Sequence, residues 1–229
     1  MAEAVVDVWV LDTAGPSARS APPAPSHGSP DTGVLDDHER ERWARLADGP
    51  TARAYLELHL LARSQIGSLL DRPPGSLRFD RTCPDCGRQH GRLVLLDDPG
   101  LHVSLSRAGA VVALALTRSA PVGVDVEHVE GTRFEGFGEV ALHPRERTAA
   151  DAPAEAHAAA WVRKEAALKA LGVGLRVEPA SFVTPRPGVA TEVVPGLPSL
   201  AVVDVDAPAG CAAAVALLSA DGPFEVRRH

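Results

Sequence analysis

The sequence lacks the marks of several classes of protein. No stretch of its 229 residues approaches the ~18 uninterrupted apolar residues of a membrane-spanning helix, and the start MAEAVVDVWVLD has no basic segment followed by an apolar block. The three cysteines, Cys83, Cys86 and Cys211, are too few and odd in number for a secreted disulfide framework. These absences predict a soluble protein of the cytoplasm with no membrane partner.

Basic charge is also scarce. The net charge is −7, whereas binding to nucleic acid needs clustered lysine and arginine, so we expect no nucleic-acid partner. Lysine occurs only as Lys164 and Lys169, which makes both residues candidates for a specific role. Hydrophobic residues make up 45% of the chain, which is enough for a real core in one large domain or two small ones.

The first half of the chain is expected to combine helices with short strands. Residues 14–33 are rich in proline, serine and glycine without apolar periodicity, and they predict a surface loop. Acidic residues at Asp36 and Asp37 favour the start of a helix, and Thr51 is a candidate cap for a longer, buried helix that ends before Asp71. Strands are expected at residues 5–11, 76–79, 92–96, 102–106 and 111–116.

The second half repeats this mixture. A strand is expected at residues 122–127, a glycine-rich loop at 131–138 and a helix at 144–171. Further strands are expected at residues 181–184, 191–195, 199–205 and 211–218, with a loose tail at 221–229. Helix plus antiparallel strands in each half predicts an α+β architecture of two similar lobes, residues 1–117 and 118–229.

The segment GVDVE at residues 123–127 carries a candidate metal site. A strand would send Val124 and Val126 into the core and hold Asp125 and Glu127 together on the opposite face. Proteins usually hold Mg²⁺ with one or two carboxylates, while water and substrate phosphates fill the remaining positions. An ordinary edge strand with its acids in solvent has the same pattern, so the motif alone leaves both interpretations open.

The segment WVRKEAALKALG at residues 161–172 predicts a helix of strong helix formers that ends in glycine. Glu165 and Lys169 share one face of that helix. They could form a surface pair worth only about 0.3–0.5 kcal/mol. The scarcity of lysine favours a functional role instead. In this role Glu165 completes a metal site with Asp125 and Glu127, and lysine neutralises the negative charge of a phosphate.

Together the two segments resemble the 4′-phosphopantetheinyl transferases of the Sfp type, whose pattern is G-[IV]-D-[IV]-E followed by W-x-x-K-E-[AS]-x-x-K. Gly174-Leu175 and Ser181-Phe182 match the turn and the strand start that follow in the family, and the similarity covers about residues 34–183. The resemblance implies a monomer of two lobes in a pseudo-twofold arrangement, with the active site in the cleft between them. It also implies coenzyme A as substrate and an acyl or peptidyl carrier protein as partner.

The resemblance further implies roles for the acids and lysines. Asp125, Glu127 and Glu165 would be ligands of Mg²⁺, which Mn²⁺ could replace. Lys164 and Lys169 would lie near the pyrophosphate of coenzyme A. Glu165, or a water close to it, would take the proton of the carrier serine as 3′,5′-ADP departs, and Lys169 would stabilise the transition state or protonate the leaving group. The identity of the base stays open.

Other residues are implied in binding the phosphates of coenzyme A. Arg53 lies in a segment that is similar to the family's long N-terminal helix. Arg92-Leu93 stands where many members read K-P, and Ser106-Arg107 stands where the family reads S-H. Arginine keeps the charge and can donate two hydrogen bonds to a phosphate, but a role specific to histidine would be lost. These departures leave open an alternative function, a weak or inactive relative that binds coenzyme A or a carrier protein as a regulator.

The segment CPDCGRQHG at residues 83–91 has a separate chemistry. A C-x-x-C pair with a nearby histidine can bind Zn²⁺ through Cys83, Cys86 and His90. A fourth ligand is not evident, and a reduced turn that orders the loop on the adenine side is the alternative. Cys211 lies in an apolar strand and is expected to be a core residue.

Overall fold

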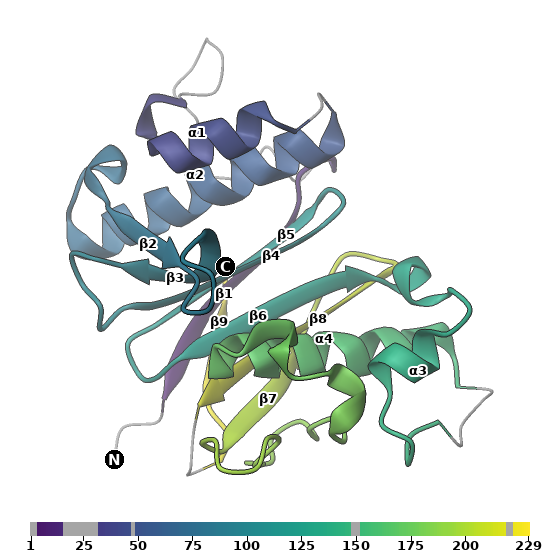
Figure 1. The fold of residues 1–229 in the computed structure, drawn as a ribbon. Helices are drawn as coiled ribbons and strands as arrows, with labels where there is room; N and C mark the ends of the chain where they lie inside the picture. Colours follow the sequence, from purple (N-terminus) through teal and green to yellow (C-terminus); the bar gives the residue numbers. More distant parts are fainter. Residues whose placement is uncertain (1–3, 16–31, 47–48, 148–151, 219–221) are drawn as a thin grey trace.

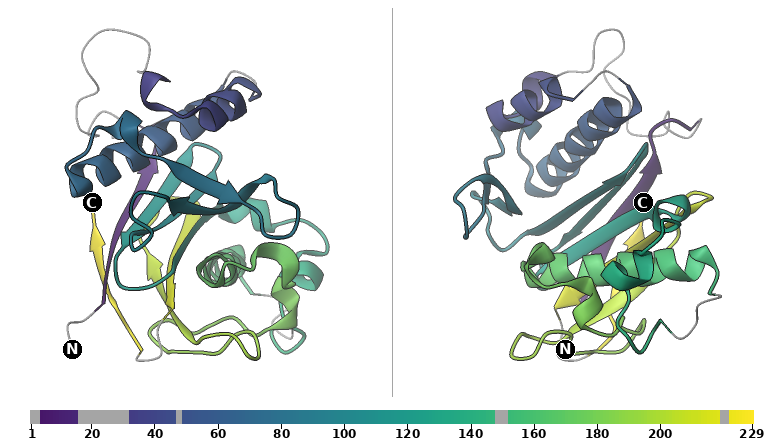
Figure 2. Two further views of the ribbon diagram at one scale, coloured as in Figure 1. Left: turned by 60° about the vertical axis from the view of Figure 1, so that its left-hand side comes forward. Right: turned by 45° about the vertical axis from the view of Figure 1, so that its right-hand side comes forward.

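The computed structural model describes residues 4–15, 32–46, 49–147, 152–218 and 222–229. Within these residues the chain is an α+β protein in which two β-sheets face each other and helices cover their outer faces (Figure 1). From one side to the other the layers are helix α2, a six-stranded sheet, a three-stranded sheet and helix α4. Figure 2 shows that α2 and α4 lie on opposite sides of the paired sheets.

The six-stranded sheet has the order β2-β3-β4-β5-β1-β9. Its strands are β1 (Val5–Asp12), β2 (Phe79–Thr82), β3 (Gln89–Leu95), β4 (His102–Ala108), β5 (Val111–Thr117) and β9 (Glu225–Arg228). Strand β9 pairs with β1 in parallel, so the prediction of a loose tail is wrong. Phe224 anchors this end of the chain because its side chain is buried in the core between the sheets, a contact that local sequence cannot indicate.

The outer face of this sheet is covered by α2 (Pro50–Leu70), beside the shorter α1 (Asp37–Ala44). Leu58 and Ile66 of α2 pack against Leu114 of β5. The helix starts two residues earlier than a cap at Thr51 predicts, because Gly49 is its N-cap and Pro50 takes the first helical position, where its missing N–H costs nothing. Thr51 therefore does not cap the helix.

The three-stranded sheet has the order β6-β8-β7, with β6 (Val122–His128), β7 (Leu200–Val205) and β8 (Cys211–Leu218). Valines and alanines of both sheets fill the space between them, and their small side chains allow a close approach. On the other face lies α4 (Ala154–Leu171), preceded by the short α3 (Phe137–Ala141).

Several expectations for the second half are corrected here. The strands expected at residues 181–184 and 191–195 do not form, and the second segment contributes only an isolated bridge between Thr191 and Leu200. The carbonyls of Pro179 and Phe182 instead accept hydrogen bonds from Lys164, which takes them out of any ladder. The expected helix at 144–171 is shorter, and residues 148–151 lie outside the described residues, as does most of the loop predicted at 14–33.

The two sheets meet along strand β4 and the free edge of β6. The backbone N–H of Val124 donates to Ser104 Oγ at 2.9 Å, and the N–H of Val126 donates to Ser106 Oγ at 3.4 Å. Serine hydroxyls of one sheet thus satisfy edge groups of the other, which would otherwise be buried without partners. A division into lobes at residues 117/118 remains a prediction, and β9 of the second segment belongs to the sheet of the first.

Candidate active site

Strand β6 presents its acids toward helix α4. Val124 and Val126 are 0% and 2% exposed and lie in the core between the sheets. Because side chains alternate along a strand, Gly123, Asp125 and Glu127 occupy the other face, on which α4 packs. A strand with one apolar and one acidic face therefore forms one wall of the site.

Gly123 sets the distance between this strand and the helix. A Cβ at this position would lie 2.0 Å from the carbonyl oxygen of Ala166 and 2.6 Å from the backbone N of Ala170, both in α4. No side chain larger than hydrogen fits there, since atoms at such distances overlap. The close approach places Glu165 and Lys169 of α4 beside Asp125.

Asp125 is the centre of a buried polar network. It is 6% exposed, and its Oδ1 accepts hydrogen bonds from Ser106 Oγ and Lys169 Nζ, each at 2.7 Å. The Lys169 ammonium also donates to Ser106 Oγ and to the carbonyl of Val124, each at 3.0 Å. All three protons of the ammonium are therefore donated to these acceptors, and Lys169 and Ser106 together hold the carboxylate of Asp125 in one orientation.

Glu165 stands next to this network without a hydrogen bond of its own to it. Its Oε1 is buried and has no partner among the described residues. Burial and the neighbouring carboxylate of Asp125, with a smaller effect of Glu127, raise the pKa of Glu165 to about 6, although Lys169 opposes the rise. An unpartnered buried oxygen in a negative field is a position where a cation would be stabilised.

The donor set fits a hard divalent cation. Asp125, Glu127 and Glu165 supply carboxylate oxygens, and only Lys169 opposes their charge among the groups that act on Glu165. In the described part of the chain the ligand oxygens of the three acids do not all lie within 4.8 Å of one another, and Glu127 Oε1 accepts from the N–H of His128 at 2.7 Å. The acids are therefore gathered on one face but not drawn together around a single point.

A comparison with protein families shows what the segment that carries these acids is similar to. Residues 121–193 match the model of the 4′-phosphopantetheinyl transferase superfamily, and the match includes β6 and the whole of α4. In this segment the chain is similar to that superfamily. A comparison with curated proteins finds no match. The similarity supports transfer of phosphopantetheine as the general activity, and the acids and Lys169 all fall within the matched residues.

Lys164 is paired with Glu146 and not with the acids of β6. Its side chain is fully buried, and Nζ donates to Glu146 Oε2 and to three carbonyls at 2.8–2.9 Å. Burial lowers the pKa of Lys164, while the bond to Glu146 opposes that effect. In the free protein Lys164 ties α4 to α3 and to the segment around Phe182, and its three protons are shared among four acceptors, so a place near the pyrophosphate stays a prediction.

Arg92 of β3 retains capacity for an anion. Its Nη2 is buried without a partner among the described residues, and burial lowers its pKa. Its Nη1 lies near Gly172, the residue that ends α4, because a Cβ built on that glycine would be 3.9 Å from it. A guanidinium from the six-stranded sheet thus reaches the end of the helix that carries Glu165 and Lys169.

Arg53 and Arg107 lie on the other side of β4. Val103 faces the core under α2 and Ser106 faces β6, so the alternation of β4 places Arg107 on the α2 side with Val103. Arg53 is exposed on α2, Arg107 is half-buried, and neither side chain has a hydrogen-bond or ion-pair partner among the described residues. The structure does not bring these two arginines into the acid cluster, and Ser106 is already occupied by Asp125 and Lys169.

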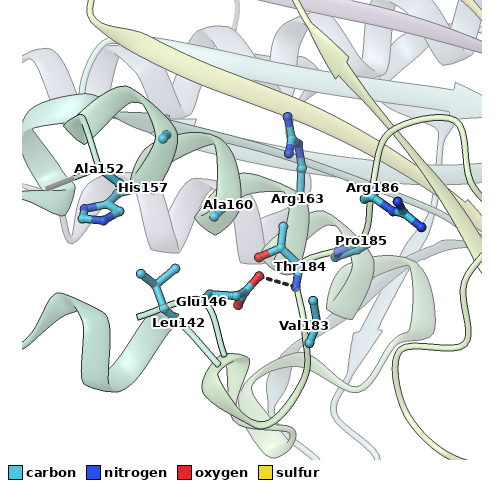
Figure 3. A pocket seen from close by; sticks show the side chains of 11 residues that line it. Leu142, Glu146, Ala152, His157, Ala160, Arg163, Val183, Thr184, Pro185 and Arg186 are labelled. Carbon is cyan, nitrogen blue, oxygen red and sulfur yellow. Dashed lines mark hydrogen bonds between the residues drawn. The ribbon is translucent and has the colours of Figure 1, made fainter. Parts of the chain in front are cut away.

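Two hollows were not expected from the sequence. One, of about 370 Å³, is lined by Glu146, His157, Arg163 and Arg186 among others, and Figure 3 shows Glu146 bonded across it to the backbone of Thr184. The other, of about 110 Å³, includes Glu127 itself. The remaining lining of this second hollow is largely apolar and consists of Gly131, Thr132, Phe134, Phe137, Val140 and Trp161.

No helix in the described part of the chain combines the length and the apolar character needed to cross a membrane.

Proposed function

We propose that this chain transfers the 4′-phosphopantetheine of coenzyme A to a serine hydroxyl of an acyl or peptidyl carrier protein and releases 3′,5′-ADP. The observation that carries the proposal is the convergence of three carboxylates and Lys169 on the β6–α4 contact, inside the segment that matches the superfamily. The charge of this cluster suits a substrate that arrives with a divalent cation on its pyrophosphate.

Asp125, Glu127 and Glu165 would hold Mg²⁺, or Mn²⁺ in its place. When bound, the ion supplies positive charge that polarises the phosphoryl group and neutralises charge on the leaving oxygen. Burial and then the charge of Asp125 raise the pKa of Glu165 in the free protein, and a divalent cation would relieve this destabilisation of its ionised form.

Glu165 is the proton acceptor we assign. Burial and the charge of Asp125 raise its pKa to about 6, and its Oε1 has no hydrogen-bond partner among the described residues. A base with a pKa near the working pH combines a useful fraction of the ionised form with proton affinity. Lys169, fixed by Asp125 and Ser106, would stabilise the negative charge that develops at the transferred phosphate.

The arginines would bind the phosphates. Arg92 has a buried donor still free and approaches the end of α4, so we assign it to the pyrophosphate side. Arg53 and Arg107, which lie on the α2 side of β4, would take the more distant phosphate of coenzyme A. Ser106 positions Asp125 and Lys169 and is not assigned to a phosphate.

The direct test incubates the chain with coenzyme A, Mg²⁺ and an apo carrier domain, and measures by mass spectrometry whether the carrier gains one phosphopantetheine. We expect modification by the natural chain and at least a hundredfold lower rate for Asp125→Asn and Glu165→Gln, an order of magnitude suited to groups acting in the transition state. Glu130→Gln is the matched control, because this exposed acid lies on the 3-10 turn directly after β6 and, among the described residues, forms an ion pair with Arg133 alone.

The same assay separates transfer from regulation. A chain that binds coenzyme A in calorimetry but modifies neither an acyl nor a peptidyl carrier domain would support the regulatory alternative, which the arginine at position 107 favours. Normal turnover by a folded Glu165→Gln variant would remove Glu165 from the role assigned to it.

A further inference from the structure

The turn between β2 and β3 holds a second group of metal-binding side chains. Cys83, Cys86 and His90 each offer one ligand atom, and these atoms lie within 4.8 Å of one another. Cys86 Sγ is 3.0 Å from His90 Nε2. Cys83 and Cys86 lie in the turn, His90 lies in β3, and none of the three is assigned a role in the phosphopantetheinyl transfer proposed above.

The backbone of the turn explains why the side chains converge. The N–H of Cys83 donates to the carbonyl of Arg88 at 2.8 Å, and the N–H of Gly87 donates to the carbonyl of Cys83 at 2.9 Å. Gly87 has a φ of 68°, which reverses the chain directly after the second cysteine and which few other residues adopt without strain. The reversal returns His90, at the start of β3, to the same end of the hairpin as both thiols.

The strands below the turn are held equally close. A Cβ on Gly91 would lie 2.7 Å from the carbonyl oxygen of Thr82, so glycine is needed for β2 and β3 to pair at this point. Thr82 pairs with Gln89, with an irregular register just before it. The hairpin is therefore shaped by two glycines so that the residues flanking the turn share one end.

The chemistry of the three groups points to zinc. Two sulfurs and one imidazole nitrogen form a donor set that suits Zn²⁺ and disfavours Mg²⁺ or Ca²⁺. Without a metal Cys83 Sγ has one long hydrogen bond, 3.9 Å to Asp85 Oδ2, whereas Cys86 Sγ contacts His90 and accepts from Arg88 Nε at 3.4 Å. Both cysteines are free thiols, so no disulfide holds the turn.

We propose that Cys83, Cys86 and His90 bind one Zn²⁺ that fixes the β2–β3 turn. The fourth position is open to water or to Asp85, whose carboxylate stands beside Cys83. Cys83 is buried whereas Cys86 and His90 are exposed, so the ion would lie at the surface with one of its ligands buried in the protein.

The zinc site lies close to the C-terminal end of α4. Arg176, in the segment after α4, donates to Asp85 Oδ1 at 3.1 Å, so the turn touches the end of the second half of the chain. Arg92, two residues after His90, approaches Gly172 at the end of α4. A zinc-fixed turn would hold β3 and its arginine against this end of the helix.

The test measures metal in the purified natural chain by mass spectrometry of the elements, after dialysis without chelator. We expect about one zinc ion per chain. Reconstitution of the stripped protein with Co²⁺ should give the visible absorption bands of a thiolate-bound cobalt ion. Cys86→Ser and His90→Gln should lose the bound zinc, while Cys211→Ser, which removes the remaining thiol in β8, should retain it.

Two results would overturn the proposal. One is natural protein that contains no zinc, binds none added in slight excess, and shows no thiolate band with Co²⁺. The other is a Cys211→Ser variant that loses zinc as fully as Cys86→Ser does. Both metal content and the cobalt spectrum are measured on the natural chain, so a variant that fails to fold leaves the test intact, and neither readout depends on transferase activity.

Discussion

Replacing Glu165 by glutamine should stabilise the metal-free protein at neutral pH. The pKa of Glu165 rises from its ordinary value of 4.5 to about 6, chiefly through burial and then through the charge of Asp125. A rise of about 1.5 units at 1.36 kcal/mol per unit corresponds to about 2 kcal/mol of differential stability. Because the raised pKa favours the protonated form, this stability is present below pH 4.5 and is lost as the pH rises through about 6.

The measurement is urea unfolding of both proteins in magnesium-free buffer between pH 4.5 and pH 7.5. Glutamine keeps the shape and removes the titration, so Glu165→Gln should be about 2 kcal/mol more stable at pH 7.5 and about equal to the natural chain at pH 4.5. Glu130→Gln, an exposed acid on the 3-10 turn after β6, should show no such trend. Added Mg²⁺ should stabilise the natural chain and close the gap, because a bound ion relieves the same repulsion.

A difference between the two proteins that is the same at pH 4.5 and pH 7.5 would refute the reasoning. It would mean that folding does not shift the pKa of Glu165, so that neither burial nor the charge of Asp125 acts on it as proposed. A variant that is less stable at pH 7.5 would show that ionised Glu165 has a partner that the described residues do not contain.

Three further predictions follow from buried contacts. Lys164→Met should cost about 3–5 kcal/mol in urea unfolding, because it leaves Glu146 and three carbonyls without their donor, and a cost below about 1 kcal/mol would contradict the network. Gly123→Ala should lower the thermal midpoint and the rate of carrier modification together, since its Cβ would overlap Ala166 of α4. Burial raises the pKa of Glu39, but hydrogen bonds and charge from His59 and Arg63 outweigh burial and hold the pKa at about 2. Glu39→Gln should therefore lower the free energy of unfolding by about 3 kcal/mol at pH 7, and this loss should shrink as the pH falls from 4.5 toward 2.

Local rules predict β6 and α4 well. The alternation of valine with acid in β6 indicates which side chains enter the core, and helix formers ended by Gly172 indicate the extent of α4 at its C-terminal end. Both patterns depend on contacts within a few residues. The α+β class follows from the same kind of evidence, because it needs only the types of the elements and not their partners.

Partners distant in the sequence are what such rules miss. Strand β9 forms only because β1, more than two hundred residues earlier, offers a free edge. The scarcity of lysine made Lys164 and Lys169 equal candidates. Positions five apart on a helix point about 140° apart, so Lys169 reaches Asp125 while Lys164 is buried against Glu146. The sequence does contain a pattern that marks Glu39. Asp36 and Glu39 have the spacing of a capping box, and the structure shows that box at the start of α1.

The position of the acid cluster follows from the way the two sheets are joined. If β4 and β6 paired through their backbones, the N–H groups of Val124 and Val126 would be taken up by carbonyls, and no side chain would be needed at the seam. Serine hydroxyls take that place instead, and the hydroxyl of Ser106 serves the backbone of β6, the carboxylate of Asp125 and the ammonium of Lys169 at once. One small side chain thereby links the edge of a sheet to the charges of the site, so the joint that holds the two sheets together also fixes the geometry on which the chemistry depends.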